Sequence, residues 1–223
     1  MKTINVVIPA FNEASRIGDT LKAVQELNNI AKIIVVNDGS TDNTADIARH
    51  HTMDVINLYE NIGKGGAMNK ALSYINADII VFLDADLGET ANEAGKLIDE
   101  VISGHADLAI AAFPPPQKKG GFGLVKGLAV YALKKAGANK VTAPLSGQRA
   151  MTKEVLKAVT PFSEAYGVEL AMSIKALRSG FKIIEVPTTM KHNETGRDLA
   201  GFKHRGKQFL DVLKVIIYEK GAK

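Results

Sequence analysis

The stretch that decides the fold reads Ala77-Asp78-Ile79-Ile80-Val81-Phe82-Leu83-Asp84-Ala85-Asp86. Residues 79–83 are all bulky and apolar, which predicts a strand buried on both faces. Asp84 and Asp86 follow it directly, and at the period of a strand their side chains would point the same way. Two like charges held close together repel unless a cation lies between them, and a hard divalent ion prefers oxygen ligands. The pattern therefore predicts a metal-binding pair of carboxylates; the alternative is a strand-end turn with two solvated aspartates.

Outward from this stretch, strand and helix patterns alternate. Apolar runs at 4–8, 33–36 and 55–58 each precede a helical pattern, which indicates a parallel sheet with crossover helices. Beyond the central stretch we predict a helix at 93–102, a strand at 108–112, a turn at 146–149, a helix at 167–178, a strand at 182–186 and a helix at 202–218. Ligands of such sheets bind at the carboxyl ends of the strands. The polar residues expected there are Asn12, Glu13, Asp38, Asn61 to Gly66, Asp84 and Asp86.

Composition and missing motifs narrow the class of protein. The chain of 223 residues is 46% hydrophobic and 23% charged, which is ordinary for a soluble globular protein. It contains no cysteine, so a cytoplasmic location is expected, and the first strand begins too early to leave room for a signal peptide. No G-x-G-x-x-G follows the first strand and no G-x-x-x-x-G-K-[ST] occurs, which argues against hydride transfer and against a P-loop ATPase.

Charge is unevenly distributed along the chain, although the net charge is only +4. Residues 108–153 contain no acid and carry the basic residues Lys118, Lys119, Lys126, Lys134, Lys135, Lys140, Arg149 and Lys153. The basic C-terminal part of the chain, which begins with this segment, is expected to contact an anionic partner. Nucleic acid is disfavoured as that partner, because aromatic residues are few and no nucleic-acid-binding motif occurs. Leu124, Leu128 and Tyr131, with Val125 beside them, form an apolar stripe that has two interpretations: it packs on the core, or it lies on a membrane surface.

Six short motifs together resemble the family-2 glycosyltransferases of the GT-A fold, especially the dolichyl- or polyprenyl-phosphate sugar synthases. They are Ile8-Pro9-Ala10-Phe11-Asn12-Glu13, Val36-Asn37-Asp38-Gly39-Ser40-Thr41-Asp42, Asn61-Ile62-Gly63-Lys64-Gly65, Asp84-Ala85-Asp86, Ser146-Gly147-Gln148-Arg149-Ala150 and Glu185-Val186-Pro187. The resemblance implies a Rossmann-like α/β domain with a mixed, mostly parallel sheet flanked by helices. It covers nearly the whole chain and is specific for the superfamily, but not for the substrate.

The resemblance also implies a donor site for a nucleotide diphosphate sugar. Its Asp38 would accept a hydrogen bond from uracil, which favours a UDP-sugar, and Lys64 would be an additional cation near the nucleotide. The metal would be Mg²⁺ or Mn²⁺ on Asp84 and Asp86, with His192 resembling the third ligand of retaining enzymes such as the 3-phosphoglycerate synthases. The residues assigned to the nucleotide sugar are Pro9, Ala10, Asn12, Glu13, Asp38, Lys64, Asp84 and Ala85.

Acceptor residues are expected in the second half of the chain. Glu169 matches the carboxylate that deprotonates the acceptor in inverting members, and with Asp86 it forms the predicted catalytic set. Three arginines are candidates to grip an anionic acceptor, because a guanidinium fits phosphate and carboxylate bidentately. The residues assigned to the acceptor are Ser146, Gly147, Arg149, Arg197 and Arg205. The chain has no tryptophan, so the Q-x-x-R-W motif of processive synthases is absent and a single transfer is favoured.

We therefore expect a single-domain glycosyltransferase, with a nucleotide-sugar-binding half at 1–112 and an acceptor-binding half at 113–223. The favoured acceptor is polyprenyl phosphate, which would place a cytoplasmic protein at the inner face of the membrane; a homodimer is compatible with this. One alternative is a retaining transferase to a soluble phosphorylated acid such as 3-phosphoglycerate. The alternatives of another class are a nucleotidyltransferase and an inactive nucleotide-sugar-binding protein.

Overall fold

A computed structural model describes residues 2–114, 124–138, 142–163 and 167–191. His192, Arg197, Arg205, Lys118, Lys119 and the predicted helix at 202–218 lie outside the described residues. The elements in chain order are β1 (Ile4–Ala10), α1 (Ile17–Gln25), β2 (Ile30–Asn37), α2 (Thr44–Arg49), β3 (Asp54–Asn57), α3 (Lys64–Ala71), η1 (Leu72–Tyr74), β4 (Ile79–Phe82), η2 (Gly88–Glu93), α4 (Ala94–Ile102), β5 (Leu108–Ala112), α5 (Leu124–Lys135), β6 (Arg149–Thr152), α6 (Lys153–Val159), α7 (Val168–Arg178) and β7 (Ile183–Pro187).

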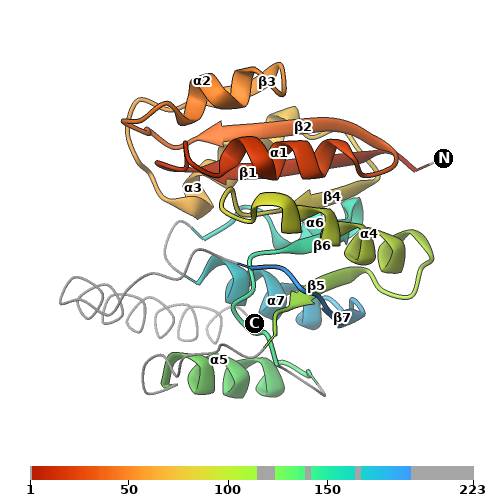
Figure 1. Cartoon of the computed structure of the whole chain (residues 1–223). Coiled ribbons are helices and arrows are strands. Elements are labelled where there is room, and N and C mark those ends of the chain that lie inside the picture. The colour runs from red at the N-terminus through yellow and green to blue at the C-terminus, as the bar shows by residue number, and fades with distance from the viewer. Residues whose placement is uncertain (1, 115–123, 139–141, 164–166, 192–223) are drawn as a thin grey trace.

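The strands form one seven-stranded sheet in the order β3-β2-β1-β4-β6-β5-β7 (Figure 1). The first four pair in parallel, as the alternating sequence pattern predicts. β6 runs antiparallel to both β4 and β5, so the sheet is mixed and mostly parallel. Both the predicted fold class and the single α/β domain are confirmed.

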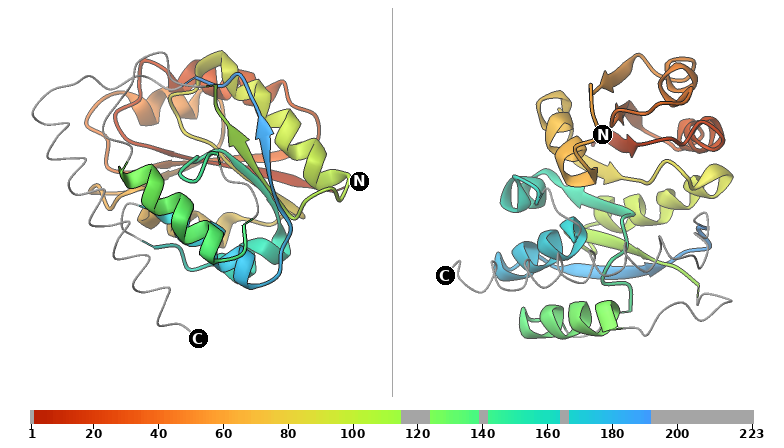
Figure 2. Two further views of the ribbon diagram at one scale, coloured as in Figure 1. Left: turned by 90° about the horizontal axis from the view of Figure 1, so that it is seen from below. Right: turned by 90° about the vertical axis from the view of Figure 1, so that its left-hand side faces the viewer.

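Helices cover both faces of the sheet (Figure 2). One core lies between the sheet and α1, α2 and α4, and a second lies between the sheet and α3, α6 and α7. Successive side chains of a strand point to opposite faces of the sheet and so pack into different cores. Val6 and Ile8 pack into the first core, whereas Val7 packs into the second. α5 packs on the outer side of α7 through a smaller cluster that includes Ala129, Leu133 and Leu170.

The interpretation that the stripe on α5 packs on the core is confirmed for Val125 and Leu128, which are partly buried against the α5–α7 cluster. Tyr131, which belongs to the same stripe, is 59% exposed, so the core interpretation is wrong for this residue. Three lysines are exposed on α5 as well: Lys126, Lys134 and Lys135. The described surface of α5 therefore exposes three lysines together with one large aromatic side chain.

Three predicted details of the sheet are wrong. The first strand does not stop with the apolar run at 4–8 but continues through Pro9 to Ala10, because β4 pairs with β1 only as far as Val7 and a proline beyond that ladder costs no hydrogen bond to β4. β4 ends at Phe82, so Asp84 and Asp86 follow in irregular backbone and a turn, and the strand period does not orient them. The predicted turn at 146–149 ends in a strand, since Arg149 opens β6 and pairs with Phe82.

Candidate active site

Asp84 is held in place by Gln148. The backbone N–H of Asp84 donates to Gln148 Oε1 over 2.9 Å, and Gln148 Nε2 donates to Asp84 Oδ2 over 2.7 Å. The two residues meet because β6 runs antiparallel to β4, which brings the loop before Arg149 beside the carboxyl end of β4. Gln148 is fully buried and has no assigned role among the predicted site residues, although it stands inside the quoted motif Ser146-Gly147-Gln148-Arg149. It fixes both the backbone and the carboxylate of Asp84.

Lys64 joins Asp84 to Glu169. Its Nζ lies 2.5 Å from Asp84 Oδ1 and 2.8 Å from Glu169 Oε1. Lys64 is the first residue of α3, whereas Glu169 stands in the first turn of α7, so each approaches along a different helix. Burial by itself disfavours the ammonium ion, but the charges of Asp84 and Glu169 outweigh it and raise the pKa of Lys64 above its ordinary value. The structure thus brings together three residues that the sequence predicts in separate roles.

Gly147 leaves the space that this cluster needs. A Cβ atom at this position would lie 2.4 Å from Lys64 Nζ and 2.9 Å from Asp84 Oδ2. Both distances are shorter than real Cβ contacts allow, so a larger residue would displace one of the two charged groups. Gly147 therefore lies beside Lys64 and Asp84, and its assignment to the acceptor stays a prediction.

Further acidic groups surround this point. Glu13 follows β1, and its backbone N–H donates to Thr44 Oγ1 over 2.8 Å. Burial, followed by the negative charges of Asp86, Asp42 and Asp84, raises the pKa of the Glu13 carboxyl. The concentration of negative charge favours a cation in this region.

Asp38 has a clear structural role. It is 3% exposed, and its two carboxylate oxygens accept hydrogen bonds from the backbone N–H groups of Ile62 at 2.8 Å and Gly63 at 2.9 Å. The next residue, Gly39, has φ +70°, and a Cβ there would lie 2.5 Å from the backbone carbon of Glu60. Asp38 and Gly39 together hold the loop before α3 against the end of β2. Recognition of uracil by Asp38 stays a prediction.

The other residues assigned to the donor lie at the same edge of the sheet. Asn12 has φ +57°, a conformation that asparagine tolerates, and its Oδ1 accepts from the Thr41 N–H over 2.9 Å. It thereby ties the loop after β1 to the loop after β2. Pro9 and Ala10 end β1, and the Ala85 carbonyl accepts from Thr20 Oγ1 over 2.8 Å.

Arg149 is fully buried. Its Nε donates to the Ser146 carbonyl and its Nη1 to Ser173 Oγ, each over 2.9 Å. Burial lowers the pKa of the Arg149 guanidinium to about 10. Within the described residues, Arg149 Nη2 and Ser146 Oγ find no hydrogen-bond partner. Arg149 thus faces α7 rather than solvent, and acceptor contact by Ser146 or Arg149 stays a prediction.

No group of three or more His, Cys, Asp or Glu side chains is arranged for a metal ion in the ranges that the structure describes. His192 lies outside those ranges. The carboxylate of Asp84 nevertheless suits a cation, because its Oδ1 already contacts the Lys64 ammonium. Carboxylate oxygens are the ligands that Mg²⁺ and Mn²⁺ accept.

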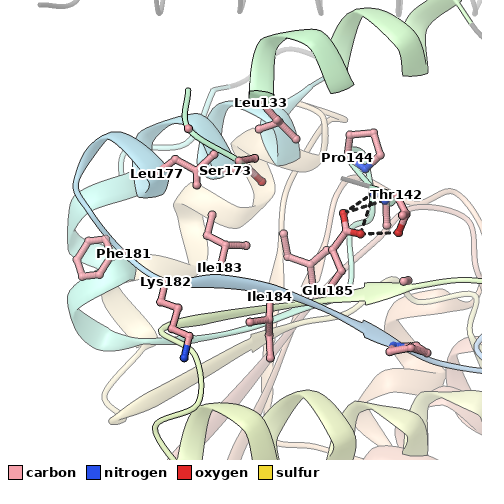
Figure 3. Close-up of a pocket in the computed structure, with 16 residues that line it drawn as sticks. Leu133, Thr142, Pro144, Ser173, Leu177, Phe181, Lys182, Ile183, Ile184 and Glu185 are labelled. Carbon is pink, nitrogen blue, oxygen red and sulfur yellow. Dashed lines mark hydrogen bonds between the residues drawn. The ribbon is translucent and has the colours of Figure 1, made fainter. Parts of the chain in front are cut away.

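A separate cavity of about 540 Å³ lies between α5, α7 and the strands β5 and β7 (Figure 3). Its lining is mostly apolar and includes Leu133, Leu177 and Ile183. Glu185 points toward Thr142 at its rim, and its carboxylate accepts from the backbone N–H groups of Thr142 and Ala143. Glu185 therefore fixes the segment that leads to Ser146 and Gly147, beside Lys64 and Asp84.

Comparison with known proteins places these features in context. The family described as "Glycosyl transferase family 2" matches residues 5–159. An uncharacterized protein of Methanocaldococcus jannaschii, MJ1222, is 32% identical over 206 residues, covering 86% of this chain and 82% of the relative. Glycosyltransferase AglJ of Haloferax volcanii is 28% identical over 198 residues, covering 86% of this chain. The matched part is 64% of the length of AglJ.

Among solved structures, glucosyl-3-phosphoglycerate synthase of Mycobacterium tuberculosis, in complex with Mg²⁺ and UDP, superposes with a TM-score of 0.82. The match covers 100% of this chain and 80% of that one at 24% sequence identity, so it bears on the fold. Among the helices in the described ranges, none is long and apolar enough to cross a membrane.

Proposed function

The chain belongs to glycosyl transferase family 2, and on that premise we propose that it moves one sugar from a nucleotide diphosphate sugar to an anionic acceptor. The observation that carries the proposal is the contact of Lys64 with both Asp84 and Glu169. This contact places charged groups beside the carboxyl end of β4, where open α/β sheets bind their ligands. Residues 1–112 would bind the donor and residues 113–223 the acceptor. The nucleotidyltransferase alternative loses its support, because the chain belongs to a glycosyltransferase family.

Asp84 and Asp86 would hold Mg²⁺ or Mn²⁺ against the two phosphates of the donor. The bound ion would supply positive charge that stabilises the departing nucleotide diphosphate. The acidic surroundings that raise the pKa of Glu13 support a cation here. The structures of the M. tuberculosis synthase contain UDP with Mg²⁺ or Mn²⁺, which supports the same choice of ligands for this chain.

Glu169 would act on the acceptor side. An acceptor oxygen attacks the anomeric carbon of the sugar while the bond from that carbon to the diphosphate breaks. If the attacking group is a hydroxyl, Glu169 would accept its proton. A phosphate acceptor is already ionised near neutral pH and needs no base, in which case Glu169 would only anchor Lys64. Glu169 is buried and its carboxylate is oriented by Lys64, which supports a fixed position in either case.

Nucleotide binding tests the donor assignment. With Mn²⁺ present, UDP at 100 times its dissociation constant is expected to add about 2.7 kcal/mol of stability, or roughly 5–10 °C in melting temperature. UDP without Mn²⁺ should add much less, because the phosphates would meet Asp84 and Asp86 without a neutralising ion. A thermal-shift screen of nucleotides with and without Mn²⁺ measures both effects. Stronger stabilisation by GDP than by UDP would assign a different base and remove the role of Asp38 with uracil.

Polyprenyl phosphate is the acceptor that we place first. The exposed lysines of α5 and the absence of acid from residues 108–153 support contact with an anionic membrane surface. Such contact would place the protein at the inner face of the membrane. The second candidate is a soluble phosphorylated acid, because structures of the M. tuberculosis synthase include complexes with phosphoglyceric acid and with glycerol 3-phosphate.

Vesicle binding separates the two acceptors. With the lipid acceptor, the protein is expected to sediment with anionic vesicles at low salt, and Lys126→Glu/Lys134→Glu should release it. Each lysine near such a surface contributes on the order of 1 kcal/mol, and the attraction fades with added salt. The matched control is Lys70→Glu/Lys157→Glu, on α3 and α6, which makes the same change of charge at exposed positions outside the acid-free segment. Absence of sedimentation, together with transfer to 3-phosphoglycerate, would favour the soluble acceptor.

A further inference from the structure

Both the backbone and the side chain of Lys64 are held in position by neighbouring residues. Its backbone follows Gly63, whose N–H donates to the buried carboxylate of Asp38 over 2.9 Å, so the start of α3 is anchored to the end of β2. Its side chain is about one third exposed and contacts Asp84 at 2.5 Å and Glu169 at 2.8 Å. The ammonium group therefore lies between two carboxylates from different parts of the fold, on a backbone that is itself fixed.

Asp84 is already engaged at both carboxylate oxygens. Oδ1 contacts Lys64, and Oδ2 accepts from the buried amide of Gln148 over 2.7 Å. The backbone of Gly147 lies close to the same two groups, since even a Cβ there would overlap Lys64 and Asp84. A divalent ion that approaches Asp84 therefore meets either the neutral amide of Gln148 or the charged ammonium of Lys64.

Charge decides which ligands can enter. A divalent ion alone would add two positive charges within a few ångström of Lys64, and like charges at that distance repel strongly in a partly buried site. UDP carries more negative charge than one divalent ion neutralises, and a UDP-sugar carries about as much as one divalent ion neutralises. With either ligand the ion no longer brings uncompensated positive charge, so the repulsion on the Lys64 ammonium is removed, and with UDP it becomes an attraction.

Resting on the proposed function, we propose that Lys64 is a placeholder cation that couples metal binding to donor binding. In the donor-free protein it occupies Asp84 and Glu169 in place of the metal. It leaves Asp84 when a divalent ion and a nucleoside diphosphate bind together. Lys64 is thus a positioning residue whose presence weakens the binding of metal alone and favours the joint binding of metal and donor.

The test is a titration of the full chain with Mn²⁺, in which free Mn²⁺ is followed by electron paramagnetic resonance, with and without UDP. Lys64→Met is expected to bind Mn²⁺ without UDP at least about ten-fold more tightly than wild type, because a like charge near the ion has been removed. UDP should strengthen Mn²⁺ binding markedly in wild type and much less in Lys64→Met. Lys64→Arg retains the charge and should stay close to wild type.

Two further variants keep the result interpretable. Lys70→Met removes the same charge from an exposed position on the same helix and should change Mn²⁺ affinity less than about two-fold, as is usual for exposed charges. Lys64→Gln preserves a polar group and replaces Lys64→Met if that variant fails to fold. A purely structural role for Lys64 would weaken Mn²⁺ binding in the variants instead of strengthening it.

The outcomes separate this inference from the proposed function. If wild type binds Mn²⁺ with UDP but Lys64→Met and Lys64→Gln show no gain in affinity for Mn²⁺ alone, the placeholder role is overturned and the proposed transferase stands. If wild type binds no Mn²⁺ even with UDP, the metal-dependent function fails, and the inference fails with it.

Discussion

The Asp86→Ala variant is expected to lose sugar transfer by a factor on the order of 10³ or more at saturating donor. The reason is that Asp86 is one of the two carboxylates that would hold the metal, and metal stabilisation of a leaving diphosphate is worth several kcal/mol. Initial rates of transfer with saturating UDP-sugar and Mn²⁺ measure the effect.

The same variant is expected to fold as stably as wild type. Asp86 lies in a turn beyond the end of β4, and its charge contributes to raising the pKa of Glu13, so the repulsion relieved by its removal offsets the loss of its other interactions. Thermal unfolding without ligands checks this expectation. The control is Asp46→Ala, a change at a side chain 72% exposed on α2, which should leave turnover unchanged and, through loss of the exposed ion pair with Arg49, lower stability by less than about 1 kcal/mol. Near-normal turnover of Asp86→Ala would remove the metal mechanism.

The second large effect concerns stability rather than catalysis. Asp38→Ala is expected to lower the free energy of unfolding by on the order of 3 kcal/mol, because two backbone N–H groups lose a charged acceptor in a part-buried loop. Asp38→Asn should cost less, since its amide oxygen can still accept a bond from Ile62 or Gly63. Urea unfolding at neutral pH without nucleotide measures both variants.

The control for this experiment is Asp99→Ala, which removes an exposed carboxylate from α4 and should change stability by less than about 0.5 kcal/mol. If Asp38→Ala unfolds at the same urea concentration as wild type, the carboxylate does not hold the loop before α3. Its role would then be confined to the nucleotide. A combined result, with lost stability and lost preference for UDP, would show that one carboxylate serves both the loop and the base.

Local sequence patterns are sufficient to predict the strands in the parallel part of the sheet. The strands near Val6, Val35 and Val81 are short apolar runs between helical patterns, and periodicity detects such runs well. β6 is different, because its four residues, Arg149 to Thr152, include two polar ones and lie next to a motif that resembles a turn. It becomes a strand because β4 and β5 flank it on both sides, and this tertiary context leaves no local signal.

In the candidate site too, the sequence predicts individual residues but not the contacts between them. The D-x-D pattern predicts Asp84 as a site residue, and the family resemblance predicts Lys64 and Glu169. Their mutual contact depends on how α3, β4 and α7 pack, which no spacing in the chain encodes. The sequence predicts no role for Gln148 for a related reason: its bond to Asp84 requires the reversed direction of β6.

The strand order β4-β6-β5 also governs how the protein can be assembled during its synthesis. β5 is complete at Ala112, yet its neighbour toward β4 is β6, which begins only at Arg149. A nascent chain that has emerged only as far as β5 therefore carries two strands with unpaired edges, and such edges invite pairing with other chains. Residues 1–112 cannot complete their own sheet, and the last central strand to be synthesised both joins the two edges and delivers Gln148 to Asp84.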